Sequence, residues 1–194
     1  MSTPALEIQP RRLRADAARN RAKVLDAARA AFAEHGTDAQ MEEIARRAGV
    51  GVGTVYRHFP TKQALAEALV EERFKRTIAY TTELLEEPDP WLAIVKSFEF
   101  CATTQEQNRA WAGVLAGIAG GSGAMQPAEH QLGQLLANTE RMLDRARAAG
   151  AIRPDLKPAD MPPLYCGLAA VVQAGVADWR RYLELLLAGL RAPA

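Results

Sequence analysis

The sequence has few of the residues that build catalytic centres, metal sites or disulfide frameworks. It contains two cysteines, Cys101 and Cys166, and three histidines, His35, His58 and His130, among 194 residues. Two cysteines without metal-ligand spacing exclude a disulfide framework and argue against a zinc site, and the histidines are scattered. No nucleophile stands in an evident pairing with a base. We therefore expect neither an enzyme nor a cofactor, and a protein kept in a reducing cytoplasm.

Long apolar runs and strand patterns are also missing. The longest apolar run, about residues 164–177, is shorter than the 18 or more residues that a membrane span needs. The N-terminus has no apolar stretch of signal-peptide length, so we expect no membrane partner. Nowhere do apolar and polar residues alternate as they do in a half-buried strand. With 48% hydrophobic and 24% charged residues, the composition is that of an ordinary globular protein. The lack of strand patterns predicts an all-α fold.

The net charge of +1 hides an uneven distribution. Residues 1–62 carry eleven Lys/Arg against seven Asp/Glu, whereas residues 63–194 carry thirteen against sixteen. A basic end on a slightly acidic body is typical of a protein that approaches phosphates with one end only. Ordinary surface variation also produces differences of this size, so the charge alone does not identify a nucleic-acid partner.

Residues 41–59 have the pattern of two short helices joined by a glycine turn, the unit that places a helix in the DNA major groove. Gly49 stands where a helix ends with a positive φ, a conformation that glycine adopts without steric cost. The chain then restarts, with Val55 and Phe59 on the buried side, and Pro60 ends the second helix. The first helix has an apolar stripe at helical spacing, formed by Met41, Ile44, Ala45 and Ala48.

The remaining chain is predicted to be helical, which gives nine helices in three parts. Residues 1–14, with three arginines and two prolines, are predicted to be a flexible basic arm that either enters the minor groove or is a simple tail. Residues 15–62 form the helix-turn-helix domain and residues 63–194 the body. Besides the two short helices, helices are expected over about 16–35, 61–85, 90–104, 107–118, 127–149, 159–177 and 178–191, with Gly36 ending the first and Thr61 capping the fourth.

The N-terminal region resembles the TetR (tetracycline repressor) family of bacterial transcriptional regulators. The resemblance rests on Ala27-Ala28, Phe32, Gly36, Ile44-Ala45, Ala48-Gly49-Val50, Tyr56, His58-Phe59, Lys62 and Leu65. Beyond about residue 85 it is one of layout, except that residues 179–190 look like the last helix of many members. The resemblance implies a TetR-like fold, a homodimer, a double-stranded DNA operator and a small-molecule effector.

The resemblance also implies which residues bind DNA. Tyr56, His58 and Lys62 match positions that contact phosphates, with a surface or capping residue as the less favoured alternative for His58. A cation in the first turn of a helix is unfavourable for the helix dipole, which favours a phosphate role for Lys62. Thr54 is placed to touch base edges, and Arg57 to take a phosphate or read guanine. The whole predicted set is Gln40, Met41, Val52, Gly53, Thr54, Tyr56, Arg57, His58 and Lys62.

Two departures from the family pattern affect this site. Gln40 replaces the usual serine or threonine cap of the first short helix, although Glu43 keeps the partner position of a capping box. Gly51, Val52 and Gly53 replace the usual polar cap and longer side chains at the start of the recognition helix. Few side chains there can read bases, so DNA shape and half-site spacing are expected to contribute to specificity.

The last two helices are predicted to form the dimer interface. The final helix is apolar around nearly its whole circumference, so more than one of its sides must be covered. One side can cover the body's own core, and the other most simply meets a second copy in a four-helix interface; a monomer with an internal helix sandwich is the alternative. The predicted interface residues are Leu164, Leu168, Val171, Val172, Gly175, Tyr182, Leu183, Leu186, Leu187 and Leu190.

The body is expected to hold an effector pocket, as the resemblance implies. Its candidate lining residues are Phe98, Cys101, Trp111, Leu115, Met142 and Tyr165. The same spacing is typical of plain core packing, so each of them could be a core residue instead. Few charges are expected among them, which favours an apolar or aromatic ligand.

The function predicted from the sequence is that of a ligand-responsive DNA-binding regulator. Repression, rather than activation, is the family's default. The alternative is a helical small-molecule-binding or scaffolding protein whose DNA binding has weakened. Weak, salt-insensitive DNA binding would favour that alternative.

Overall fold

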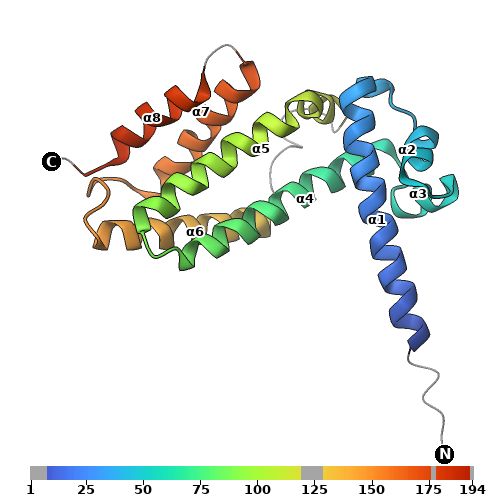
Figure 1. Cartoon of the computed structure of the whole chain (residues 1–194), viewed down its shortest axis with the longest axis horizontal. Coiled ribbons are helices and arrows are strands. Elements are labelled where there is room, and N and C mark those ends of the chain that lie inside the picture. The colour runs from blue at the N-terminus through green and yellow to red at the C-terminus, as the bar shows by residue number, and fades with distance from the viewer. Residues whose placement is uncertain (1–7, 119–128, 176–177, 193–194) are drawn as a thin grey trace, which may run out of the picture. The chain divides into compact units, whose positions relative to one another are not determined.

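The computed structural model describes residues 8–118, 129–175 and 178–192, and the side chains of 15–109, 129–175 and 178–192. This part of the chain is helical apart from turns and one isolated antiparallel bridge between Ile152 and Arg191, so the all-α prediction is confirmed. No helix in it is long and apolar enough to cross a membrane. The α-helices (Figure 1) are α1 Ile8–His35, α2 Met41–Ala48, α3 Val52–His58, α4 Lys62–Glu83, α5 Pro90–Ile118, α6 Glu129–Ala148, α7 Met161–Ala174 and α8 Trp179–Leu190.

Two helix boundaries differ from the sequence prediction. The segments predicted as separate helices over 90–104 and 107–118 form the single helix α5, so the described residues contain eight α-helices instead of nine. Residues 105–107 are polar but include neither glycine nor proline, and glutamine and glutamate continue a helix readily. Helix α1 begins at Ile8, well before Asp16, because Pro10 lies in the first turn, where its missing N–H has no partner to lose. Residues 8–14 are therefore helical, and residues 1–7 lie outside the described chain.

The helix ends follow local signals that the sequence shows directly. Gly36 has φ +60° and Gly49 has φ +65°, as expected for glycines that end helices. The Thr61 hydroxyl accepts a hydrogen bond from the Ala64 N–H at 3.0 Å, which confirms its role as the cap of α4.

The chain divides into two compact units, and the first contains α1, α2, α3 and the start of α4. Unit 1 comprises residues 1–70 and 110–126. Helix α1 packs against both α2 and α3. Each helix contributes its apolar stripe to a common core, which explains why short helices of seven and eight residues are held in place. The buried residues include Val24, Ala28, Phe32, Ile44, Ala45, Val55, Phe59, Leu65 and Leu69.

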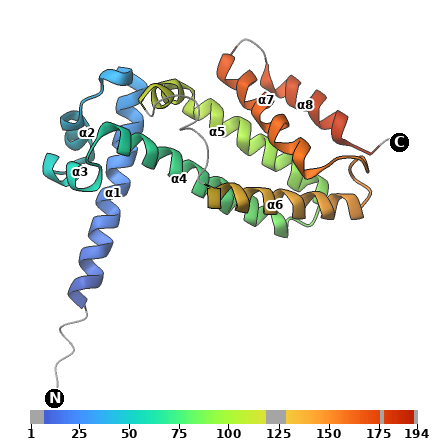
Figure 2. The same cartoon turned by 180° about the vertical axis from the view of Figure 1, so that it is seen from behind.

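Unit 2 comprises residues 71–109 and 127–194 and contains the rest of α4 with most of α5 and all of α6, α7 and α8. Its main core joins α5, α6, α7 and α8 around Phe98, Leu143, Leu168 and Leu183. The end of α4 and α6 lie side by side in both views (Figures 1 and 2). Polar bonds join them there: the Asn138 amide donates to the Thr81 and Thr82 hydroxyls at 3.0 Å each.

Candidate DNA-binding surface

Helix α3 has one buried face and one exposed face. Val55 and Phe59 are buried, as predicted, whereas Val52 is 38% and Tyr56 is 42% exposed. Arg57 is exposed and Thr54 half-buried. The face that is turned away from the core therefore carries a hydroxyl, a phenol and a guanidinium, which are groups that can contact phosphates and base edges.

The turn before α3 is made by glycine geometry. Gly49 ends α2 in the left-handed conformation, and its N–H donates to the Arg46 carbonyl at 3.2 Å. Gly51 begins α3 in an extended conformation without a side-chain cap. A Cβ built on Gly51 or Gly53 would meet no atom within 4 Å. The backbone at the start of α3 is thus exposed and free to approach another surface closely.

Two of the predicted DNA-contacting residues have other surroundings in the structure. The predicted DNA contact of Met41 stays a prediction, and its side chain is 5% exposed and belongs to the core of unit 1. Its place in the apolar stripe of α2 is the physical reason for this burial. The Lys62 ammonium donates to the Thr37 carbonyl at 2.8 Å. This contact gives Lys62 a structural role that the helix-dipole argument did not foresee.

Helix α2 has no side-chain cap at Gln40, the position where the sequence departs from the family pattern. The Gln40 side chain does not cap the helix and instead donates to the Asp38 carbonyl at 2.7 Å. The Glu43 carboxylate accepts from Arg47 Nε at 2.9 Å and lies 3.2 Å from His35 Nε2. Glutamine lacks the short hydroxyl that a capping box needs, so Glu43 pairs with the cation one turn away.

Arg47 joins α1 to α2 through two carboxylates. Its guanidinium donates to Glu34 Oε1 at 3.0 Å and to Glu43 Oε1 at 2.7 Å. These hydrogen bonds hold the pKa of Glu34 and of Glu43 below the ordinary value, and they raise the pKa of Arg47. Arg47 is therefore engaged inside unit 1.

Arg46 differs from its neighbour, and sequence reasoning missed the difference. Its side chain is 76% exposed and reaches Glu43 only at 3.8 Å. Adjacent residues on a helix point about 100° apart, and no sequence signal says which of two adjacent arginines meets α1. The structure makes Arg46 the arginine of α2 that is available to phosphate.

The remaining predicted DNA residues keep exposed or half-exposed positions. The Tyr56 hydroxyl lies 3.5 Å from Glu42 Oε1, and the residue is 42% exposed. The half-buried ring of His58 is tilted against Phe59, with 6.2 Å between ring centres. Arg21 of α1 lies over the ring of Phe59, with its guanidinium carbon 5.5 Å from the ring centre. Gln40, Val52 and Gly53 are exposed.

In unit 2, three of the predicted pocket residues come together. Phe98 is fully buried and stacks on Tyr165 with 4.3 Å between ring centres. The Tyr165 hydroxyl lies 2.7 Å from Ser97 Oγ, a partner that the sequence did not indicate. Burial raises the pKa of Tyr165, and it raises the pKa of Cys101, one turn further along α5, to about 11. These groups are neutral at physiological pH.

The other predicted pocket residues do not join that cluster in the described structure. Met142 is buried in a separate core cluster with Leu84, Leu85 and Ala93. The side chains of Trp111 and Leu115 lie outside the described residues. The structure does contain an open groove, but α7, α8 and residues 153–160 line it, and none of the six predicted pocket residues does.

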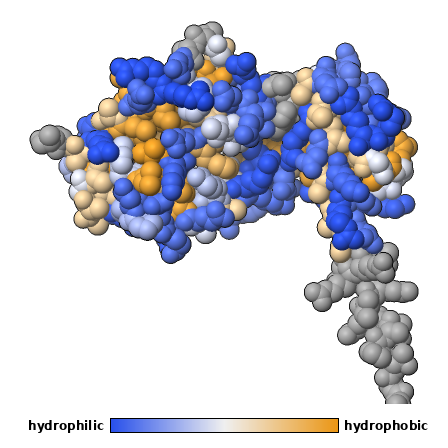
Figure 3. All heavy atoms as spheres, in the orientation of Figure 1, coloured by the Kyte–Doolittle hydropathy of each residue, from blue (hydrophilic) through white to orange (hydrophobic). Residues whose placement is uncertain are grey.

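The predicted dimer residues divide into two faces of α7 and α8. Leu168, Val172, Leu183 and Leu190 are buried in the core of unit 2, and their place in a dimer interface stays a prediction. The twist of each helix turns them inward. Leu164, Val171, Tyr182, Leu186 and Leu187 are half-buried, and Gly175 is exposed. Figure 3 shows apolar side chains gathered on a face of unit 2 over α7 and α8.

A helix-turn-helix whose second helix exposes polar and basic side chains defines a DNA-binding regulator. Comparison with known proteins agrees. Residues 24–69 match the family of bacterial regulatory proteins of the tetR type, and residues 89–192 match the C-terminal domain of SbtR-like transcriptional regulators. The chain belongs to the TetR family of bacterial transcriptional regulators.

Individual relatives give the same result. The chain is 30% identical to the A-factor receptor protein of Streptomyces griseus over 137 residues, which cover 70% of this chain and 47% of that protein. It thus spans about half the length of this curated relative, and less of others.

Solved structures of regulators from two other bacteria share the fold. A TetR transcription regulatory protein from Mycobacterium vanbaalenii has 36% identity and a TM-score of 0.70, over 93% of this chain and 99% of that one. The TetR transcriptional regulator SCO0520 from Streptomyces coelicolor has 34% identity and a TM-score of 0.68, over 90% and 99%. Both likenesses extend over unit 1 and unit 2.

Proposed function

We propose that this protein is a ligand-responsive repressor that binds a near-palindromic DNA operator as a homodimer in the cytoplasm. The observation that carries the proposal is the exposed face of α3, where Thr54, Tyr56 and Arg57 lie opposite the buried Val55 and Phe59. Membership of the TetR family supports it. Residues 15–62 are assigned to DNA binding, and residues 63–194 to effector binding and dimerisation.

The chemistry of the exposed face assigns two kinds of contact. Tyr56 and Lys62 hold phosphates, and His58 and Arg46 add further backbone contacts. Thr54 touches base edges through its hydroxyl or its methyl, and Arg57 reads guanine or takes a phosphate. Gly53, beside the exposed Val52, lets the helix backbone approach the groove. In a dimer the two α3 helices lie about 34–36 Å apart, one turn of DNA.

Effector binding acts in this proposal by shifting a population. An apolar or aromatic molecule in unit 2, beside Phe98 and Tyr165, favours a body state in which α4 moves the two DNA-binding domains out of register with successive grooves. A ligand shifts the equilibrium only by its difference in affinity for the two states. A tight ligand that leaves operator affinity unchanged contradicts this part.

The proposal is tested by fluorescence anisotropy of the purified protein on the DNA flanking its own gene. Tight, site-specific binding is expected, with affinity falling about 10³–10⁵-fold between 50 and 200 mM salt if about 6–10 phosphates are contacted. A scrambled duplex of the same composition is the control. Shallow or absent binding at low salt contradicts the repressor function and supports a helical binding or scaffolding protein.

A further inference from the structure

Three side chains with metal-binding atoms converge in unit 1, at the junction of α1 and α2. Glu34 and His35 are the last two residues of α1, and Glu43 lies in the first turn of α2. The His35 Nε2 atom lies 3.2 Å from Glu43 Oε1 and 3.6 Å from Glu34 Oε2. The histidines are scattered in the sequence, but the turn after α1 brings this one beside two carboxylates. Among the residues that the structure describes, this is the one group of three such ligands within 4.8 Å of one another.

The separations match those around a small metal ion. Zn²⁺ binds imidazole nitrogen and carboxylate oxygen at about 2.0–2.2 Å in tetrahedral sites, which places neighbouring ligand atoms about 3.4 Å apart. The two distances from His35 Nε2 lie on either side of that value. One imidazole and two carboxylates are a donor set that holds zinc, with a water completing the shell. The side chains of Glu34, His35 and Glu43 are 55%, 45% and 23% exposed, so an ion can reach them from solvent.

The segment between the two helices is fixed by its own contacts. The Lys62 ammonium donates to the Thr37 carbonyl at 2.8 Å. Ala39 is fully buried, and so is Ile44, the residue that follows Glu43. Because the backbone on both sides of the turn is anchored, the three donors are near one another before any ion binds, which lowers the cost of assembling a site.

A positive charge already stands at the point on which the three donors converge. Arg47 Nη2 donates to Glu34 Oε2 and, at 2.7 Å, to Glu43 Oε1. The same nitrogen lies 3.4 Å from His35 Nε2. The Arg47 side chain is long, rich in rotamers and 23% exposed, so it can move into solvent. A divalent ion carries twice its charge and accepts a lone pair from each of the three atoms.

We propose that Glu34, His35 and Glu43 form a binding site for a divalent transition-metal ion such as Zn²⁺, which displaces the Arg47 guanidinium and joins α1 to α2 in its place. The imidazole selects transition metals over Mg²⁺ and Ca²⁺, which prefer oxygen ligands. The site goes beyond the proposed function, because it requires neither DNA nor an effector.

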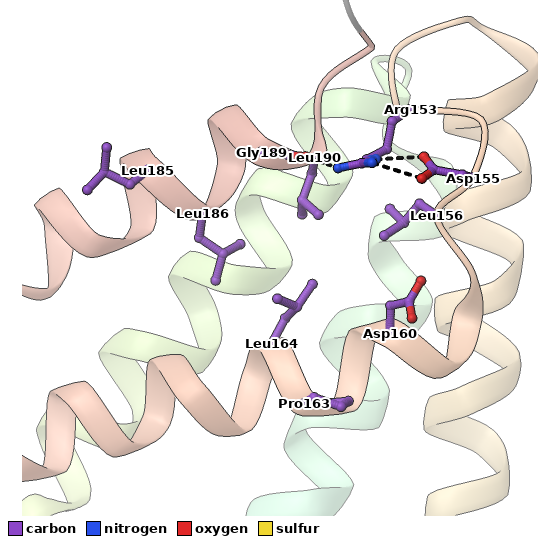
Figure 4. Close-up of a pocket in the computed structure, with 10 residues that line it drawn as sticks. All are labelled: Arg153, Asp155, Leu156, Asp160, Pro163, Leu164, Leu185, Leu186, Gly189 and Leu190. Atoms are coloured by element: carbon purple, nitrogen blue, oxygen red, sulfur yellow. Dashed lines mark hydrogen bonds and ion pairs between the residues drawn. The ribbon is translucent and has the colours of Figure 1, made fainter.

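The carboxylates at the groove of unit 2 lack this arrangement. Figure 4 shows Asp155 bonded to Arg153, with Asp160 near by, and the groove is lined by no histidine. The Asp160 carboxylate accepts from the backbone N–H of Lys157 at 2.8 Å. Oxygen donors without a nitrogen donor do not select a transition metal. The imidazole at coordination distance from two carboxylates is therefore what distinguishes the group at the α1–α2 junction.

The test is isothermal titration calorimetry of the full-length, tag-free protein with Zn²⁺, after metal has been removed with a chelator. One ion should bind per chain. H35A and E43Q should each lower the affinity about tenfold or more, because each removes a ligand. R47M should raise it about tenfold, because no guanidinium has to leave its two carboxylates. The matched controls are H130A, at an exposed histidine of α6, and E42Q, next to the site; both should bind Zn²⁺ as the wild type does.

Thermal unfolding gives a second measurement. The three donors converge only in the folded chain, so Zn²⁺ should raise the melting temperature of the wild type and of R47M. Excess chelator should reverse the rise, and Mg²⁺ at the same concentration should produce none. An equal rise with Mg²⁺ contradicts a site built around an imidazole.

The variants separate the site from its alternatives. Circular dichroism identifies any variant that misfolds, and if E43Q does, the contrast between H35A and R47M still tests the site. A Zn²⁺ affinity that H35A leaves unchanged, or that H130A lowers as much, overturns the site. An affinity that R47M does not raise overturns the competition with Arg47. Because the titration contains no DNA, failure of the metal site and failure of the repressor function are observed separately.

Discussion

The Arg47 guanidinium lies between Glu34 of α1 and Glu43 of α2, at 3.0 and 2.7 Å from their carboxylate oxygens. This bridge joins the long helix of unit 1 to the first helix of the helix-turn-helix. Arg46, next to it, is 76% exposed at the side chain. Two adjacent arginines thus have different surroundings: Arg47 is held by two carboxylates, and Arg46 is exposed, where we propose that it contacts DNA.

Replacing Arg47 with alanine should lower the melting temperature at pH 7 and lower it less in acid. Arg47 depresses the pKa of Glu34 and Glu43. A carboxyl group with a depressed pKa stabilises the folded state at pH values above its pKa in the unfolded chain, near 4.5. That stability is lost as the pH falls through the lowered pKa. The difference between R47A and the wild type should therefore shrink below about pH 4. Differential scanning calorimetry from pH 3 to 7 measures it.

Arg46→Ala is the matched control and has its own readout. It should leave the melting temperature unchanged, because an exposed pair at 3.8 Å contributes little. It should weaken DNA binding and reduce the salt slope by about two per dimer, one for each protomer. If R46A melts earlier and R47A does not, the assignment of the two arginines is reversed.

Tyr56→Phe and Lys62→Ala should weaken binding to all DNA sequences alike. Both side chains are assigned to phosphates, which carry no sequence information directly. Each variant should lose the same factor of affinity for the operator as for a scrambled duplex, measured by fluorescence anisotropy. Because Lys62 also bonds the Thr37 carbonyl, the melting temperature of K62A is measured alongside. A change in which operator is preferred contradicts the phosphate assignment.

Alanine substitutions of Gly49 and Gly53, on the two sides of the turn, should change the free energy of unfolding in opposite directions. Gly49 has φ +65°, so G49A should destabilise the fold by about 1 kcal/mol. Gly53 lies inside α3 with open space at its Cβ, so G53A should stabilise it by about 0.5–1 kcal/mol. Urea unfolding gives both values. Weaker DNA binding by G53A, despite higher stability, would support close backbone approach to the groove.

The two cysteines should differ in reactivity toward iodoacetamide. Burial raises the pKa of Cys101 to about 11, whereas Cys166 is exposed. At pH 8 only about one Cys101 thiol in a thousand is the reactive thiolate. Mass spectrometry should find Cys166 labelled first, with Cys101 labelling rising only toward pH 11. Rapid labelling of Cys101 in the C166S variant at pH 8 contradicts the buried position.

The sequence by itself determined that the chain is helical, several of the helix ends, and the inward face of the recognition helix. Gly36, Gly49 and Thr61 act within one turn of their own helix, and the apolar spacing of Val55 and Phe59 is a property of α3 alone. Such signals are local, so they can be read without knowing the partner. The helix-turn-helix followed from them, and the family was indicated by the resemblance of residues 27–65 to the TetR family.

Only the tertiary structure decided which groups meet across the fold. It selected Arg47 over Arg46 for Glu34, turned Leu168 and Leu183 into the core, and placed the groove on α7 and α8 instead of beside Phe98. It also showed that α5 continues through polar residues where no breaker stands. These outcomes depend on packing between segments far apart in the chain. The spacing of apolar residues shows which face of a helix is buried, but it does not show which other segment packs against that face.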